Sequence, residues 1–302
     1  MNKKKVLFVL GPTGVGKSSL AVNLAKKYDM EIISADSVQV YREFNIGSAK
    51  VTNKEMQGVV HYGIDILSPN QTFSASEFVD YTKLKIEEIT SKGKIPLIVG
   101  GTGLYVKALV EGYNFGGTER HEEFRNQLEQ LAELEGLESL YNKLVSLAPQ
   151  IAEKIDKQNK VRLIRAIEIA TFGSQKTKNE VDYDFLCIAL NMPREKLYEN
   201  INKRAKIMLD DGLVGEVKTL YLKYGDCQPM GAIGYKETLS FIKNEIDEKQ
   251  LLELISQHTR NYAKRQLTFL RGLDYIKYFD KTENNYQEKI EKEIDSWIQK
   301  LN

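Results

Sequence analysis

The chain has 302 residues, which suits one large domain or two domains of about 150 residues each. Hydrophobic residues make up 42% and charged residues 28%, a composition that excludes wholesale disorder. Lys and Arg total 43 against 42 Asp and Glu, so a nucleic-acid surface would have to come from local clusters. The only cysteines, Cys187 and Cys227, form no CxxC pair, which fits a reducing, cytoplasmic setting. No apolar run approaches the roughly 18 residues of a membrane span.

Strands and helices alternate in the first hundred residues. Short apolar runs predict buried strands at residues 6–10, 31–34 and 95–99, and residues 19–28 predict a helix. This alternation is typical of a parallel α/β sheet.

The pattern changes near residue 114. Residues 119–138 hold seven glutamates and two arginines at helical spacing, and residues 122–171 contain no convincing strand. Residues 185–190 predict a returning strand, Pro193 opens a helix, and residues 275–279 and 287–301 predict a last strand and a closing helix. We therefore predict a core of residues 1–113 and 184–302, interrupted by an all-helical insert of residues 114–183.

The strongest motif lies between the first strand and the first helix. It matches G-x-x-x-x-G-K-[ST], in which glycines let backbone N–H groups converge on phosphate oxygens at a positive helix end. The lysine adds a charge, and the Ser18 hydroxyl is a candidate Mg²⁺ ligand. The predicted phosphate cradle consists of Gly11, Pro12, Thr13, Gly14, Val15, Gly16, Lys17 and Ser18.

A nucleotide-hydrolysing enzyme would also need an acidic metal ligand at the end of an apolar strand. The strand at residues 95–99 ends instead in Gly100-Gly101-Thr102-Gly103, and Asp65 is a weaker candidate. Nucleotide hydrolysis is therefore not the best account of the cradle.

Asp36 follows the second strand, so it should lie at the same edge of the sheet as the cradle. A carboxylate there could serve as a general base, a metal ligand or a turn cap. Thr102, after the third strand, could bond a substrate or simply belong to a glycine turn.

Basic residues gather in the second half of the chain. Arg260, Lys264 and Arg271 fall within about 40° of one helix face, while Tyr262 and Phe269 lie opposite and are expected to pack inward. This stripe could contact RNA phosphates, or it could be a solvated helix face. Arg162 and Arg165 could likewise contact substrate, although Glu168 stands at pairing distance from Arg165. Arg204 is ambiguous in the same way, and the three histidines lack metal-ligand spacing.

Five motifs together resemble one family. They are Gly-Pro-Thr-Gly-Val-Gly-Lys-Ser, Ser-Ala-Asp-Ser-Val-Gln-Val-Tyr, Val-Gly-Gly-Thr-Gly-Leu-Tyr, Gly-Tyr-Lys-Glu and Thr-Arg-Asn-Tyr-Ala-Lys-Arg-Gln-Leu-Thr-Phe-Leu-Arg. In this order they resemble the bacterial tRNA dimethylallyltransferases, also called tRNA isopentenyltransferases, over residues 6–272.

The resemblance implies a P-loop NTPase-like core with a helical insert, and Mg²⁺ dependence. It implies transfer of a dimethylallyl group from dimethylallyl diphosphate to N6 of the adenine 3′ of the anticodon in the tRNA anticodon arm. The cradle would then hold a diphosphate rather than ATP.

Family roles carry over by position. Asp36 matches the general base, and Lys17, Thr102 and Arg204 complete the expected catalytic set. The expected tRNA contacts are Asp36, Ser37, Val38, Gln39, Thr102, Arg125, Arg162, Arg165, Gly231, Gly234, Tyr235, Lys236, Arg260 and Lys264.

Three alternatives remain open: a P-loop small-molecule kinase, an adenylate isopentenyltransferase acting on free AMP or ADP, and a non-catalytic RNA-binding module. The large basic and helical second half favours a macromolecular acceptor. We expect a monomer.

Overall fold

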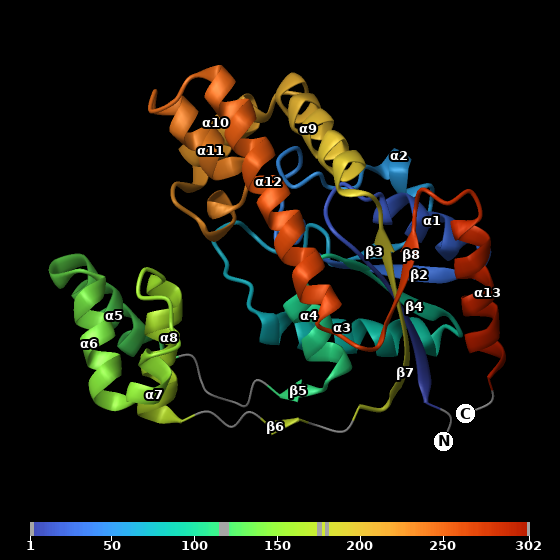
Figure 1. Ribbon diagram of the computed structural model, residues 1–302, viewed down its shortest axis with the longest axis horizontal. Coiled ribbons are helices and arrows are strands. Elements are labelled where there is room, and N and C mark those ends of the chain that lie inside the picture. The colour runs from blue at the N-terminus through green and yellow to red at the C-terminus, as the bar shows by residue number, and fades with distance from the viewer. Residues whose placement is uncertain (1–2, 115–120, 174–176, 179–180, 301–302) are drawn as a thin grey trace. The chain divides into compact units, whose positions relative to one another are not determined.

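The computed structural model describes residues 3–114, 121–173, 177–178 and 181–300. The chain forms two compact units, Met1–Val110 with Val181–Asn302 and Glu111–Glu180, which we call the core and the insert (Figure 1). In the described ranges no helix is both long and apolar enough to cross a membrane.

The core is built on a parallel sheet of six described strands in the order β3-β2-β4-β1-β7-β8. All five strands predicted from the sequence are confirmed, and the two-residue β3 is an addition. Their bounds are β1 Lys4–Leu10, β2 Met30–Ala35, β3 His61–Tyr62, β4 Ile95–Gly100, β7 Tyr183–Asn191 and β8 Ile276–Asp280.

Helices cover both faces of this sheet (Figure 1). Alternate residues such as Leu7 and Val9 of β1 pack with Leu20 and Leu24 of α1 and with Ile294 of α13. The core helices are α1 Lys17–Lys27, α2 Asn53–Met56, α3 Ala75–Ser91, α4 Gly103–Val110, α9 Arg194–Asp210, α10 Leu213–Tyr224, the 3₁₀ turn η1 Gln228–Gly231, α11 Tyr235–Ile242, α12 Glu248–Arg271 and α13 Tyr286–Gln299.

The insert has its own hydrophobic core, in which Leu128, Leu140, Leu144 and Leu163 are buried together. In the residues that the structure describes, its regular structure is helical apart from one short antiparallel ladder of β5 Tyr113–Asn114 and β6 Thr177–Lys178, which the all-helical prediction missed. A two-residue strand leaves too few alternating positions to give a sequence signal. The insert helices are α5 Glu122–Glu135, α6 Leu137–Leu147, α7 Pro149–Ala152 and α8 Lys160–Phe172.

Strand register places the predicted site residues together. Leu10 of β1 and Ala35 of β2 both pair with Gly100 of β4, so the residues that follow these three strands emerge side by side. A Cβ on Gly100 would lie 2.3 Å from the Ala35 carbonyl oxygen, so only glycine fits between the strands. The cradle and Asp36 therefore share one edge of the sheet, as the sequence predicted.

Candidate active site

The cradle has the backbone conformation that an anion nest requires. Gly11, Gly14 and Gly16 have φ angles of +143°, +80° and +89°, a region that side chains disfavour. Gly16 precedes α1 and offers no side chain to cap it, so the first amides of α1 stay available to a ligand. The side chain of Val15 is buried in the core, so this residue can offer a ligand only its backbone.

Lys17 bends back over the cradle, where its Nζ donates to the Pro12 carbonyl oxygen at 2.8 Å. Burial lowers the pKa of Lys17 to about 7, with a further lowering by the nearby Arg204 charge and a partial compensation by Asp36. A bound anion would restore the charge that burial disfavours.

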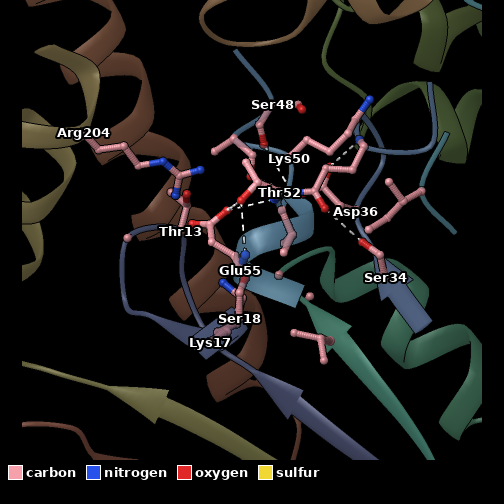
Figure 2. Close-up of a pocket in the computed structure, with 18 of the residues that line it drawn as sticks. Thr13, Lys17, Ser18, Ser34, Asp36, Ser48, Lys50, Thr52, Glu55 and Arg204 are labelled. Atoms are coloured by element: carbon pink, nitrogen blue, oxygen red, sulfur yellow. Dashed lines mark hydrogen bonds between the residues drawn. The ribbon is translucent and has the colours of Figure 1, made fainter. Parts of the chain in front are cut away.

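The cradle opens into a cavity of about 580 Å³. Its wall includes cradle residues, Ser34 and Asp36 at the end of β2, residues 45–46 and 48–52, Glu55 of α2 and Arg204 of α9. Figure 2 shows these side chains converging from separate elements on one space. We call this the first cavity.

A second cavity of about 370 Å³ adjoins the first. Both are lined by the same six residues, so they meet there: Thr13, Asp36, Ser48, Arg204, Met208 and Tyr262. The second cavity also contains Ser37, Val38, Gly231, Gly234, Lys236 and Arg265.

Asp36 stands at this junction and is also a turn cap. Its Oδ1 accepts from the amides of Val38 at 2.8 Å and Gln39 at 3.2 Å. Across the described ranges no protein donor reaches its second oxygen, which leaves that atom for a ligand. The base and cap interpretations are therefore compatible, because each uses a different oxygen.

Arg204 supplies the second charge of the junction. Burial lowers the pKa of its guanidinium, while Asp36 and Glu55 partly offset that effect. Its side chain is half-buried, and within the described part of the chain it forms no ion pair. A half-buried cation that faces a cavity without an acidic partner is a candidate contact for an anionic ligand.

Helix α12 attaches to the cradle through Gln266, whose Oε1 accepts from the Thr13 amide at 2.9 Å. The same helix carries Tyr262, whose hydroxyl is hydrogen-bonded to Thr102 and Gln266. Burial and then the Asp36 charge raise the pKa of Tyr262, so its hydroxyl keeps its proton. Thr102 itself lines neither cavity, and its contact with the site is its hydrogen bond to Tyr262.

Three side chains of the core differ from what the sequence led us to expect. The Tyr235 side chain is fully buried and bonds Glu216 and Ser48, so it does not present itself to RNA. Phe269 packs against Gly103 with its ring but stays 37% exposed, so it is only partly packed inward. Asp65, the weaker candidate for an acidic metal ligand, pairs through its carboxylate with Lys50 at 2.6 Å.

The basic stripe of α12 divides into two kinds of residue. Arg260 donates to Asn202 at 2.6 Å and lies over the ring of Tyr198, so it is partly engaged within the core. Lys264 and Arg271 are exposed.

The insert arginines bind a shared carboxylate. Glu168, only 1% exposed, pairs with Arg125 at 2.6 Å and also with Arg165. Burial alone would raise its pKa, but the hydrogen bonds from both arginines hold that pKa at about 2. Pairing with Glu168 was the alternative kept open for Arg165, and Arg125 pairs with the same carboxylate. Arg162 is exposed, and its amide is capped by Asn159 at 3.1 Å.

Several site residues were missed from the sequence. Thr259, Tyr262 and Gln266 recur at helical spacing on the pocket side of α12, and Arg265 lies beside them. That periodicity was a usable signal. Ser48 and Glu216 gave no such sequence signal. Ser48 is placed by an irregular loop, and the importance of Glu216 appears only in its hydrogen bonds to distant residues.

The fold and site define a P-loop enzyme: an anion cradle on a parallel sheet, with a carboxylate and an unpaired cation at the junction of two cavities. The junction suits a reaction in which one cavity holds a phosphorylated donor and the other an acceptor.

Comparison with known proteins identifies the family. The IPP transferase family model matches residues 39–273, and the chain belongs to this family. It is 41% identical to a tRNA dimethylallyltransferase of Bacillus anthracis, with 99% of this chain and 98% of that protein covered. A Bacillus cereus (strain AH187) relative with the same printed name is also 41% identical, over 99% of this chain and 97% of its own.

Solved structures agree with this assignment. A tRNA isopentenylpyrophosphate transferase of Bacillus halodurans is 38% identical and superposes with a TM-score of 0.75, covering 98% of this chain and 97% of its own. A eukaryotic dimethylallyltransferase acting on tRNA is 27% identical with a TM-score of 0.78, covering 98% and 79%. The family model begins after Asp36, but these full-length matches also include the cradle.

Proposed function

We propose that this chain transfers a dimethylallyl group from dimethylallyl diphosphate to N6 of the adenine 3′ of the anticodon in tRNA, and releases diphosphate. The printed names of its relatives support this activity. The observation that carries the proposal is the junction itself, where Asp36 and Arg204 line both cavities.

The first cavity suits the donor. The cradle amides, Lys17 and Arg204 surround the place where negative charge would build as the diphosphate departs. Groups fixed in advance around developing charge stabilise the transition state more than the ground state.

A magnesium ion fits the same cavity. The Ser18 hydroxyl and the Glu55 carboxylate both line it, and both are oxygen ligands of the kind Mg²⁺ prefers. No cluster of three acidic, His or Cys side chains occurs in the described ranges, so diphosphate oxygens and waters would complete the coordination. When bound, the ion would neutralise charge on the leaving diphosphate.

The second cavity suits the adenine. The base would leave its stack in the anticodon loop, at a cost of a few kcal/mol, to reach Asp36. N6 then forms a bond to the allylic carbon while the carbon–oxygen bond breaks and the diphosphate leaves with the electron pair. The second oxygen of Asp36 accepts the proton lost from N6. Because the N6 lone pair is delocalised into the ring, alignment by the pocket matters as much as basicity.

The tRNA would be held beyond the junction. Ser37, Val38, Gly231, Gly234 and Lys236 line the acceptor cavity, and Lys264 is exposed on α12. In the insert, Arg162 is the better candidate for an RNA contact, because Arg125 and Arg165 are engaged by Glu168.

The test is incubation with dimethylallyl diphosphate, Mg²⁺ and unmodified tRNA, followed by mass spectrometry of the nucleosides. We expect one dimethylallyl group on the adenine beside the anticodon. Phosphorylation of a small molecule by ATP would indicate a kinase instead. Modification of free AMP or ADP but not tRNA would indicate an adenylate isopentenyltransferase.

A further inference from the structure

Residues 44–52 form an irregular segment between β2 and α2, which we call the wall loop. Asn45, Ile46 and Ser48 line the first cavity, proposed for the donor, and Gly47 and Ser48 line the second cavity, proposed for the acceptor. The loop contains no helix or strand, so groups elsewhere in the fold must hold its backbone in place.

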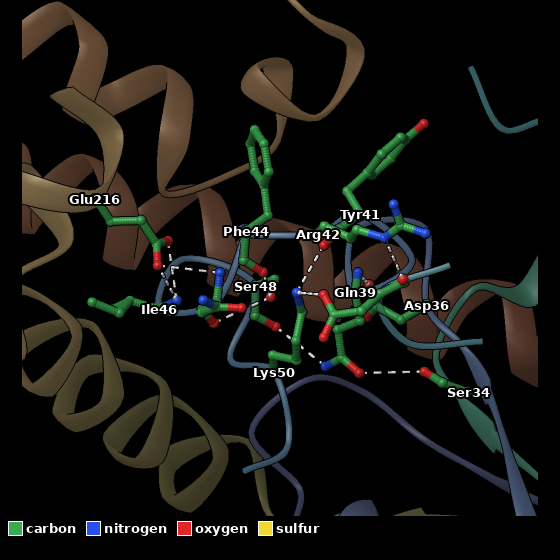
Figure 3. Close-up of polar contacts among 12 residues, drawn as sticks. Ser34, Asp36, Gln39, Tyr41, Arg42, Phe44, Ile46, Ser48, Lys50 and Glu216 are labelled. Atoms are coloured by element: carbon green, nitrogen blue, oxygen red, sulfur yellow. Dashed lines mark hydrogen bonds and ion pairs between the residues drawn. The ribbon is translucent and has the colours of Figure 1, made fainter. Parts of the chain in front are cut away.

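Glu216 of α10 holds the loop from one side (Figure 3). Its two oxygens accept from the Ile46 amide at 3.0 and 2.8 Å, and also from the amides of Asn45 and Gly47, each at 3.2 Å. A carboxylate that accepts from three consecutive amides fixes their orientation as a bound anion would.

Tyr235 completes this anchor. Its hydroxyl donates to Glu216 at 2.8 Å and accepts from the Ser48 amide at 3.2 Å. A Cβ on Gly47 would lie 2.5 Å from the Tyr235 ring, so the loop rests directly on that ring. Burial and the Glu216 charge raise the pKa of Tyr235, which keeps the hydroxyl protonated as a donor.

The other side of the loop is tied to the reaction centre. The side-chain Nε2 of Gln39 donates to the carbonyl oxygens of Ser48 at 3.3 Å and Ala49 at 3.2 Å. The backbone N–H of Gln39 donates to Asp36 Oδ1 at 3.2 Å. Figure 3 shows this connection running from Glu216 through the loop to Gln39 and Ser34. Neither cavity is lined by Glu216 itself.

We propose that Glu216 is a positioning residue for the transfer reaction. With Tyr235 it sets the wall loop, and through Gln39 the loop sets the turn that orients Asp36. Tyr235 also begins α11, directly after the Gly231–Gly234 segment of the acceptor cavity, so one hydroxyl connects the walls of both cavities. This inference rests on the proposed function.

The test compares Glu216→Gln with a matched control, Glu43→Gln. Glu43 also joins the segment before the wall loop to α10, through Lys223 at 2.9 Å and Tyr224 at 2.6 Å, but it is exposed and accepts from no wall-loop amide. We expect Glu216→Gln to lower kcat by about 10–10²-fold, because small misplacements of a reacting group carry that cost. The control should stay within about twofold of wild type.

A second measurement separates positioning from stability. The affinity for inorganic diphosphate with Mg²⁺, measured by calorimetry, should change less than about threefold, since Glu216 lines neither cavity and the cradle has its own backbone contacts. Tyr235→Phe should lower kcat in the same direction. The double variant should be no slower than the worse single variant, because both substitutions break one linkage.

Three results would overturn the idea. One is a Glu216→Gln enzyme with the turnover of Glu43→Gln. Another is a parallel loss of turnover, diphosphate binding and folded protein, which would make the role purely structural. A third is full additivity in the double variant. If wild type transfers no dimethylallyl group at all, the proposed function fails instead, and the two failures are distinguishable.

Discussion

The cations of the core pocket and those of the insert are arranged in opposite ways. Lys17 and Arg204 are sequestered beside a cavity, and in the described part of the molecule neither has an acidic partner at ion-pair distance. Arg125 and Arg165 converge on the buried carboxylate of Glu168. All four were candidate site residues in the sequence. In the described part of the molecule, only Lys17 and Arg204 of these four lack an acidic partner.

This difference distinguishes residues that are available to bind a ligand from residues that stabilise the fold. A partly buried cation without an acidic partner costs free energy that a ligand can return, whereas a paired one stabilises its own helix packing. We therefore expect turnover to depend on Lys17 and Arg204, and the stability of the insert to depend on Glu168.

The largest effect is expected from Lys17→Ala. Loss of its charge and hydrogen bonds should slow transfer by about 10²–10³-fold or more. Single-turnover kinetics with saturating tRNA measure this effect. Lys26→Ala, an exposed change on the same helix, is the control and should leave the rate unaltered. Equal rates in the two variants would remove the cradle from the mechanism.

Asp36→Asn should lower turnover by about 10²-fold or more, since an amide cannot accept the N6 proton. Asparagine can still accept from the Val38 and Gln39 amides, so the turn should survive. Filter binding should show tRNA affinity close to wild type. Near-normal turnover would leave Asp36 only its capping role, and the exposed Asp80→Asn serves as the control.

Glu168→Gln tests the insert. Replacing the shared acceptor should destabilise it by about 1–3 kcal/mol, because two arginines lose a buried charged partner. Urea unfolding measures the change against the exposed control Glu133→Gln. Diphosphate binding should be unaffected. A wild-type midpoint would mean that the ion pairs contribute nothing to folding.

The smallest effect, about tenfold at most for each pH unit, concerns the pH dependence of diphosphate binding. The Lys17 pKa of about 7 lies below that of the unfolded chain, so folding stability gains with rising pH between about 7 and 10. Binding of an anion favours the protonated amine, so diphosphate affinity should fall over the same range by up to about tenfold per pH unit. Calorimetry at pH 8 in two buffers should show proton uptake by wild type. Lys17→Arg, which stays charged, should take up less.

The sequence by itself determined five of the six described core strands, the cradle and the place of Asp36. Each follows from local rules: apolar runs bounded by turns, glycines that permit positive φ, and parallel strands that end at one edge. Helical spacing also revealed the pairing of Arg165 with Glu168 as an option.

Tertiary structure decided which polar groups remain available. That Tyr235 is buried, that Arg125 is paired and that Glu216 anchors a distant loop all depend on contacts between segments far apart in sequence. Hydrogen bonds and burial are properties of the packed chain, so a charged or aromatic residue looks the same in sequence whether it will hold a ligand or a neighbour. The physical reason is desolvation, which acts only after the core has formed and fixes each group's partners.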